Sequence, residues 1–175
     1  MIAGDSRMSL RIGIVGHRKL ASGEMAFVAR ASEEILQQVR SEHEDVIAVS
    51  AIAEGADTLF AEAAISLGVP LELVRPFDAY PSDFVGRSSR ERYNRLRASA
   101  RNEIQLKYPV RSDAAYEAAM AWVVQNSNLL VAVWDGRAAK GPGGTGHAVE
   151  RAMRLNRDWI HLNTTDFSMT PHRLV

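Results

Sequence analysis

The residues best suited to hold a ligand form a glycine-rich segment, residues 141–146, with the sequence Gly-Pro-Gly-Gly-Thr-Gly. The segment joins an apolar run over residues 129–134, which predicts a buried strand, to apolar positions at helical spacing. Backbone N–H groups and the dipole at a helix start favour an anion, and glycine lets the backbone approach it closely. A flexible surface loop is the alternative. We predict that a phosphate is bound by Gly143, Gly144, Thr145 and Gly146.

Two polar side chains follow on the predicted helix, His147 and Glu150. His147 either contacts the phosphate or is a solvated helix residue. A carboxylate beside a bound sugar phosphate can act as a general base or stabilise an oxocarbenium-like transition state, so Glu150 is the predicted catalytic residue. The alternative is that Glu150 is an acid favoured only by the electrostatics of a helix N-terminus.

A second group of candidate residues, Gly16, His17 and Arg18, follows a predicted strand over residues 11–15. Arg18 can pair with a phosphate through its planar guanidinium, and His17 can donate a hydrogen bond to one. The alternative is that Arg18 caps a loop or pairs with a surface acid. The spacing of Gly13 and Gly16 does not match G-x-G-x-x-G, which disfavours an ordinary NAD dehydrogenase.

An acidic segment, Glu54-Gly55-Ala56-Asp57, follows the second predicted strand, residues 46–51. Glu54 either accepts hydrogen bonds from ribose hydroxyls or is an acid in the first turn of a helix. Gly55 is included in this predicted ligand-binding turn. Asp57 is interpreted as a first-turn helix acid that the helix dipole stabilises.

Basic residues gather between positions 87 and 111. They are Arg87, Arg90, Arg92, Arg95, Arg97, Arg101, Lys107 and Arg111. A basic face can collect a polyphosphate or nucleic acid, whereas a solvated helix face compensated by acids elsewhere is the structural alternative.

The elements that must position these residues alternate between strand and helix. Strands are predicted at residues 11–15, 46–51, 71–74, 129–134 and 158–162. Residues 91–107 are predicted to be helical, and residues 163–175 give no firm signal. The alternation predicts an α/β fold: a three-layer, Rossmann-like parallel sheet of about five strands in the order 3-2-1-4-5, with helices on both faces.

Ligands in such sheets bind beyond the carboxyl ends of the strands, at the point where the winding reverses. In the predicted order this point lies between the first and fourth strands. The turn at residues 16–18 then lies beside Asp135, Gly136 and the glycine segment. Asp135 and Gly136 therefore join the predicted ligand-binding residues.

The length of 175 residues predicts one domain over residues 1–175 with a disordered tail at residues 1–9, and the alternative is that residues 1–7 reflect an alternative start. Basic and acidic residues number 21 each, which disfavours nucleic acid and membrane as partners. Cysteine is absent, and no apolar run suits a signal peptide or a membrane span, so we expect a cytoplasmic protein. The five histidines lack metal-binding spacing, and we expect no metal and no cofactor.

Residues 142–150, Pro-Gly-Gly-Thr-Gly-His-Ala-Val-Glu, resemble the P-G-G-x-G-T-x-x-E motif of the "lysine decarboxylase-like" Rossmannoid proteins. That group includes the LOG phosphoribohydrolases and the molybdenum cofactor carrier proteins. The Gly-His-Arg turn, the Glu-Gly-Ala-Asp segment and the Val-Trp-Asp-Gly run are similar to the wider SLOG superfamily, which is related to the DNA-processing protein DprA.

The resemblance implies a SLOG-type sensor domain that binds a nucleotide or a nucleotide derivative, and a homodimer. The alternative is a phosphoribohydrolase that cleaves the N-glycosidic bond of a nucleoside 5′-monophosphate, with Glu150 acting at that bond. Two departures from the motif count against hydrolysis: His147 replaces a threonine, and no M-x-x-R-K segment is present. Decarboxylase chemistry needs a Schiff-base lysine, and the lysines Lys19, Lys107 and Lys140 do not support that role.

Overall fold

A computed structural model of the chain describes residues 9–137 and 144–173. Its elements in chain order are β1 (Leu10–Gly16), α1 (Ser22–Glu42), β2 (Val46–Ser50), α2 (Ala56–Ser66), β3 (Leu71–Arg75), η1 (Tyr80–Asp83), α3 (Arg87–Ala98), β4 (Asn102–Gln105), α4 (Asp113–Gln125), β5 (Leu129–Trp134), α5 (Thr145–Arg154), β6 (Asp158–Asn163) and β7 (Met169–His172).

The strands form one sheet in the order β4-β3-β2-β1-β5-β6-β7. Neighbouring strands are parallel except for β6 and β7, which are antiparallel. The predicted strands correspond to β3, β2, β1, β5 and β6, and they lie in the predicted order. The α/β, Rossmann-like fold class is therefore confirmed, although the sheet has seven strands rather than about five.

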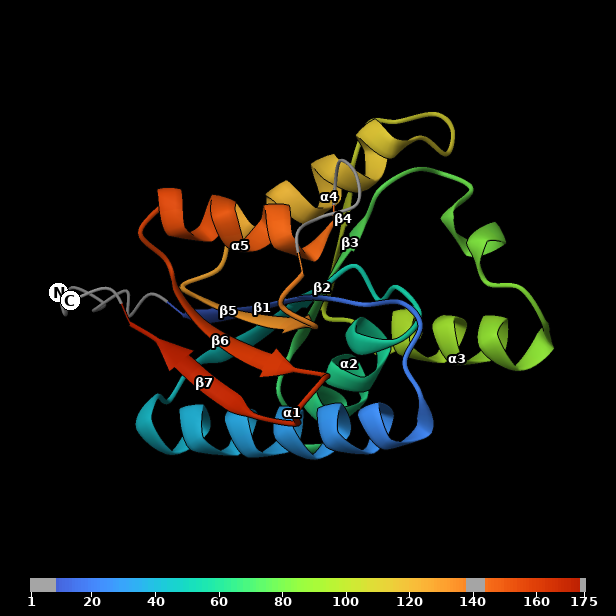
Figure 1. Cartoon of the computed structure of the whole chain (residues 1–175). Coiled ribbons are helices and arrows are strands. Elements are labelled where there is room, and N and C mark those ends of the chain that lie inside the picture. The colour runs from blue at the N-terminus through green and yellow to red at the C-terminus, as the bar shows by residue number, and fades with distance from the viewer. Residues whose placement is uncertain (1–8, 138–143, 174–175) are drawn as a thin grey trace, which may run out of the picture.

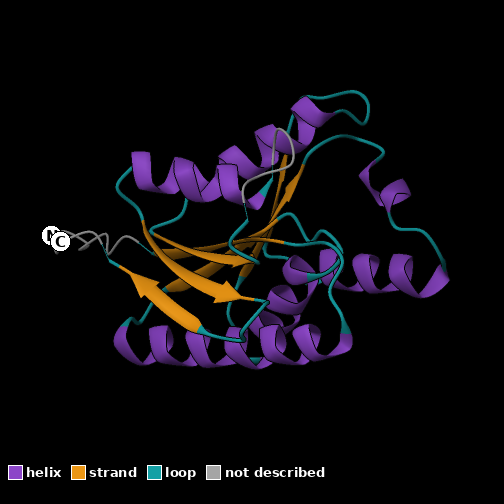
Figure 2. Cartoon of the chain, viewed as in Figure 1, coloured by secondary structure: helices purple, strands orange, loops and turns teal. Residues whose placement is uncertain are grey.

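Helices cover both faces of the sheet: α1 and α2 pack on one face, and α4 and α5 on the other (Figures 1 and 2). Two apolar clusters result, one beneath α1 and α2 and one beneath α4 and α5. The central strands are apolar along their length because helices bury both of their faces. All residues of β2 are buried, for example.

The prediction of a helix over residues 91–107 is wrong in part. Helix α3 ends at Ala98, and the chain then forms the short edge strand β4 beside β3. The sequence of β4, Asn-Glu-Ile-Gln, is polar and partly exposed, so it lacks the apolar run that identifies the inner strands. Four residues of this kind carry too little pattern to predict a strand.

The other edge strand, β7, was also absent from the prediction. All of its residues are exposed, and Pro171 lies within it. Proline is tolerated at a sheet edge because its missing N–H faces solvent there. β7 therefore has neither apolar alternation nor favourable strand composition.

Residues 1–8 lie outside the described residues, so the predicted tail over residues 1–9 is described only at Ser9, whose hydroxyl donates a hydrogen bond to Asp45. Helix α1 starts one residue after Ala21, whose N–H donates to the Glu24 carboxylate at 2.6 Å. Within the described ranges, no helix is both long and apolar enough to cross a membrane.

Candidate ligand-binding site

The turn after β1 occupies the predicted reversal point of the sheet. β1 pairs with β2 on one side and with β5 on the other, and Gly16 lies opposite Val133 in β5. The His17 N–H continues this ladder by donating to the Val133 carbonyl at 3.2 Å. The carboxyl ends of β1, β2 and β5 therefore meet where ligands bind in open α/β sheets.

Two predicted glycines allow close packing at this turn. A Cβ at Gly16 would lie 2.5 Å from the Ala56 Cβ and 2.7 Å from the Val133 Cβ. Gly55 has φ +89°, and a Cβ there would lie 2.4 Å from the His17 carbonyl oxygen. The Ala56 N–H donates to that oxygen at 3.1 Å. Together the two glycines hold the first turn of α2 against the turn after β1.

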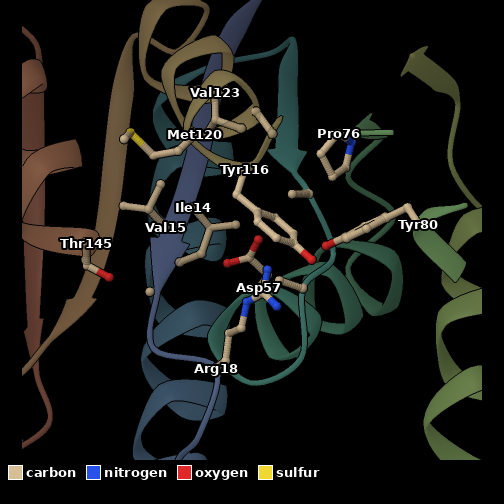
Figure 3. Close-up of a pocket in the computed structure, with 14 residues that line it drawn as sticks. Ile14, Val15, Arg18, Asp57, Pro76, Tyr80, Tyr116, Met120, Val123 and Thr145 are labelled. Atoms are coloured by element: carbon tan, nitrogen blue, oxygen red, sulfur yellow. The ribbon is translucent and has the colours of Figure 1, made fainter. Parts of the chain in front are cut away.

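A cavity of about 100 Å³ opens at this point between the ends of β1 to β3 and the helices α4 and α5 (Figure 3). We call it the β1 cavity. Its lining is mainly apolar and aromatic, with Asp57 and Arg18 as its charged members. It is lined by Ile14, Val15, Gly16, Arg18, Ala51, Ala53, Asp57, Pro76, Tyr80, Tyr116, Ala119, Met120, Val123 and Thr145.

Arg18 extends from the turn after β1 along the wall of the β1 cavity. Its guanidinium carbon lies 4.6 Å from the centre of the Tyr116 ring, which is a cation–π distance. Its Nη1 lies 3.9 Å from Oδ2 of the buried Asp83, which also accepts a hydrogen bond from the Tyr116 hydroxyl. The Arg18 side chain remains 46% exposed, so it is held in place and still accessible to a ligand.

Asp57 lies in the first turn of α2, as predicted, but its side chain also lines the β1 cavity. The residue is only 6% exposed. Burial raises the pKa of the Asp57 carboxyl to about 7, although the Ala53 backbone, Arg18 and Ser50 favour the charged form. Ser50 Oγ lies 3.5 Å from Oδ2. A carboxyl with a perturbed pKa in a cavity is a typical candidate for a functional residue.

Sequence reasoning did not identify Asp57, Tyr80 and Tyr116 as site residues. The sequence predicts a helix-dipole role for Asp57, which agrees with its position in the first turn of α2 but does not reveal its burial. Tyr80 lies in the irregular segment after β3, and Tyr116 is an inward-facing position of α4. Figure 3 shows the two tyrosine hydroxyls pointing toward each other beside the Asp57 carboxyl. The sequence does offer one signal for Asp57: it lies in the first turn of the helix that follows the predicted strand over residues 46–51.

His17, Asp135 and Gly136 lie together beside the β1 cavity rather than in its lining. The Asp135 N–H donates to His17 Nε2 at 3.2 Å, and that nitrogen lies 3.5 Å from Asp135 Oδ1. Gly136 has φ +78° and turns the chain after β5. Burial alone would raise the pKa of Asp135. The backbone hydrogen bond from Arg137 and the attraction of His17 outweigh it and lower this pKa. The predicted contact between the two turns is thus present.

The end of the glycine segment reaches the cavity at Thr145, the first residue of α5. Gly144 caps this helix, and its carbonyl accepts hydrogen bonds from the N–H groups of His147 and Ala148 at 3.0 and 3.2 Å. Gly146 is buried in the first turn. Gly143, like residues 138–142, lies outside the described residues.

Glu150 and Glu54 lie away from the lining of the β1 cavity. Glu150 is exposed on α5. Glu54 accepts a hydrogen bond from Ser89 and lines a second hollow of about 520 Å³, formed with α3. Arg18 lines both spaces. The structure therefore groups Gly16, Arg18 and Thr145 around one cavity and places the two glutamates elsewhere.

The basic segment is largely compensated by acids. Arg92 forms two hydrogen bonds with Glu62, at 2.6 and 2.5 Å. Arg97 pairs with Glu103 at 2.7 Å. These contacts connect α3 to α2 and to β4. They agree with the alternative interpretation of this segment, a solvated helix face whose charge is compensated by acids elsewhere. Among the described residues, no group of three or more His, Cys, Asp or Glu side chains is arranged to hold a metal ion.

Comparison with solved structures identifies the architecture. DNA processing protein A (DprA) from Streptococcus pneumoniae matches 87% of this chain with a TM-score of 0.63 and 16% identity. The molybdenum cofactor (Moco) carrier protein of Chlamydomonas matches 88% with a TM-score of 0.52 and 16% identity. The present chain therefore shares the fold of these two proteins. The resemblance inferred from the sequence motifs is thereby confirmed at the level of the fold.

These solved chains are longer than the present one. The present chain covers 50% of the S. pneumoniae protein and 76% of the Chlamydomonas protein. It covers 64% of the DprA from Helicobacter pylori, a structure that describes single-stranded DNA binding, with a TM-score of 0.58 and 14% identity. No protein-family model matches the sequence, and no curated protein matches it.

Proposed function

We propose that this chain is a SLOG-type domain that binds a nucleotide or a nucleotide derivative in the β1 cavity. One observation carries the proposal: Thr145, at the N-terminus of α5, and Arg18, in the turn after β1, line the same cavity at the reversal point of the sheet. A helix N-terminus and an accessible guanidinium are both suited to a phosphate. The apolar and aromatic wall between them is suited to a ring.

The charge distribution supports a small ligand over a long nucleic acid. Arg92 and Arg97 in the basic segment already pair with acids, which lowers the number of cations free to neutralise phosphates. A long strand is bound through many such phosphate contacts. The DprA from H. pylori binds single-stranded DNA, so a short oligonucleotide belongs in the ligand panel.

A panel of nucleotides tests the proposal by thermal shift. Nucleoside monophosphates, cyclic nucleotides, ADP-ribose and a short single strand are compared at equal concentration. A mononucleotide at about 100 times its Kd is expected to stabilise the protein by about 2.7 kcal/mol, and Arg18→Gln is expected to reduce that effect. The absence of stabilisation by every nucleotide in the panel would contradict the proposal.

Incubation followed by chromatography separates binding from hydrolysis. We expect the nucleotide to be recovered intact, because the predicted catalytic Glu150 is exposed and the carboxyl in the cavity lining is Asp57. Release of free base by the wild type, lost in Glu150→Ala, would instead support the phosphoribohydrolase alternative.

A further inference from the structure

The charged group that the proposed phosphate contacts leave unused is Asp57. Its carboxyl is buried in the cavity lining, and the hydrogen bond from Ser50 Oγ is long, at 3.5 Å. Backbone hydrogen bonds from Ala53 and Ala51 and the attraction of Arg18 offset part of the burial of this carboxyl, although the nearest acid to the Arg18 guanidinium among the ion pairs is Asp83, at 3.9 Å. Burial still raises the pKa of Asp57, so the compensation is incomplete and the buried charge costs free energy. A ligand that pairs with the carboxylate would recover that cost.

We propose that Asp57 selects the base of the bound nucleotide and that the base is guanine, whose N1–H and 2-amino group both donate to the carboxylate. This inference rests on the proposed nucleotide-binding function. It adds the identity of the base and the residue that reads it.

The size and the lining of the β1 cavity suit the edge of a planar ring. Val15 and Met120 provide apolar wall, and the Tyr116 ring stands beside Asp57 (Figure 3). A cavity of about 150 Å³ holds a benzene molecule, so the volume of about 100 Å³ here admits part of a base rather than a whole nucleotide. The sugar and the phosphate then extend out of the cavity toward Thr145 and Arg18.

Hydrogen-bond matching favours guanine over adenine. An ionised carboxylate offers two acceptors and no donor. Guanine presents two adjacent donors on its Watson–Crick edge, whereas adenine presents the acceptor N1 beside its amino group. A carboxylate facing adenine therefore meets a lone pair and leaves one oxygen unpaired, which is a repulsive element against that base. A pterin ring carries the same donor pair as guanine, so free pterin is compared with GMP in the test.

Protonation changes the pattern that Asp57 presents. Burial raises the pKa of Asp57 to about 7, and the protonated carboxyl, with one donor and one acceptor, matches adenine. The titratable and charged groups that face Asp57 or its neighbour Arg18 are Arg18 itself, Tyr80 and Asp83 of η1, and Tyr116 of α4. Burial raises the pKa of Tyr80 and of Tyr116, so both phenols stay protonated near neutral pH.

The ratio of the GMP and AMP affinities is the measurement that tests this inference, because both ligands carry the same titrating phosphate. Isothermal titration calorimetry of the wild type between pH 6 and pH 8 is expected to show this ratio rising by about tenfold or more, since each pH unit below a pKa changes the ionised fraction up to tenfold. The wild-type titration needs no variant that must fold.

Asp57→Asn supplies a second, opposite prediction. An amide offers one acceptor and one donor, which is the pattern that matches adenine. We expect GMP to lose about 5- to 150-fold in affinity and the preference to turn toward AMP, because a bidentate pair discriminates by about 1–3 kcal/mol. Asp113→Asn is the matched control: it removes an exposed first-turn acid from α4 and is expected to leave the ratio unchanged.

The outcomes separate the two proposals. If GMP and AMP bind equally at every pH, or if Asp57→Asn keeps the wild-type ratio, the selection by Asp57 is wrong and the nucleotide-binding function stands. If free pterin binds more tightly than GMP, the pairing of Asp57 with two adjacent donors is supported. The proposal that the ligand is a guanine nucleotide is then wrong. If no nucleotide binds to the wild type, both proposals fail.

Discussion

A single buried carboxyl dominates the chemistry of the β1 cavity at the scale of residues. Asp57 satisfies the helix dipole of α2 and is at the same time 6% exposed in a mainly apolar lining. The two roles have opposite energetic signs, because the dipole stabilises the charge and burial opposes it. The raised pKa shows that burial prevails. The free-energy cost of burying the ionised Asp57 carboxylate can therefore be measured.

The pH dependence of stability gives that cost. Burial raises the folded-state pKa of Asp57 to about 7 from 3.8, so the native state holds its proton more tightly than the unfolded state in this window. The free energy of unfolding of the wild type should therefore fall as the pH rises from about 4 to 7 and level off above 7. Asp57→Asn lacks this term, so its stability relative to the wild type should rise by roughly 2–4 kcal/mol across the window.

Urea denaturation of the wild type, Asp57→Asn and the control Asp113→Asn at several pH values measures this difference. A relative stability of Asp57→Asn that stays constant with pH would show that the carboxyl titrates normally and is solvated.

At the scale of elements, two turns are pressed together by glycine. The turn after β1 and the first turn of α2 meet at Gly55, where φ is +89° and a Cβ would lie 2.4 Å from the His17 carbonyl oxygen. This contact sets the direction in which Arg18 leaves the sheet, since the Arg18 carbonyl oxygen lies 2.5 Å from the same Cβ position. The position of α2 and the position of Arg18 are thus coupled.

Gly55→Ala tests this coupling against Gly68→Ala, a glycine with φ +67° and open space around its Cβ position. The control is expected to lose about 1–2 kcal/mol for the left-handed backbone alone. Gly55→Ala should lose more than the control, because the clash with backbone atoms adds to that strain. Equal losses, measured by urea denaturation, would show that the contact between the two turns yields easily.

The sequence was most informative where elements are long and apolar. The order of the inner strands could be predicted, because an alternation of strands and helices is compatible with few sheet topologies. The edge strands β4 and β7 are missed, since partly or fully exposed strands of four residues carry no periodic signal. In the site, Gly16, Arg18 and Thr145 followed from their positions at element ends. Asp57 and Tyr80 did not, because burial by a distant segment is a property of the tertiary fold.

At the scale of the whole molecule, equal numbers of acids and bases are arranged so that most cations of α3 have partners. The fold places the β1 cavity where strand ends, the N-terminus of α5 and Arg18 come together. The central claim is therefore that ligand binding depends on this cavity and on no other surface of the domain.

A cavity-filling substitution tests that claim most directly. Met120 lines the β1 cavity, whereas Met153 on α5 is 53% exposed, so Met120→Trp and Met153→Trp make the same chemical change inside and outside the site. Calorimetric titration with the nucleotide that the wild type binds most tightly should give an unchanged Kd for Met153→Trp. For a folded Met120→Trp, the Kd should rise about tenfold or more, which corresponds to about 1.4 kcal/mol. Equal affinities of both variants and the wild type would contradict the account and place the ligand elsewhere.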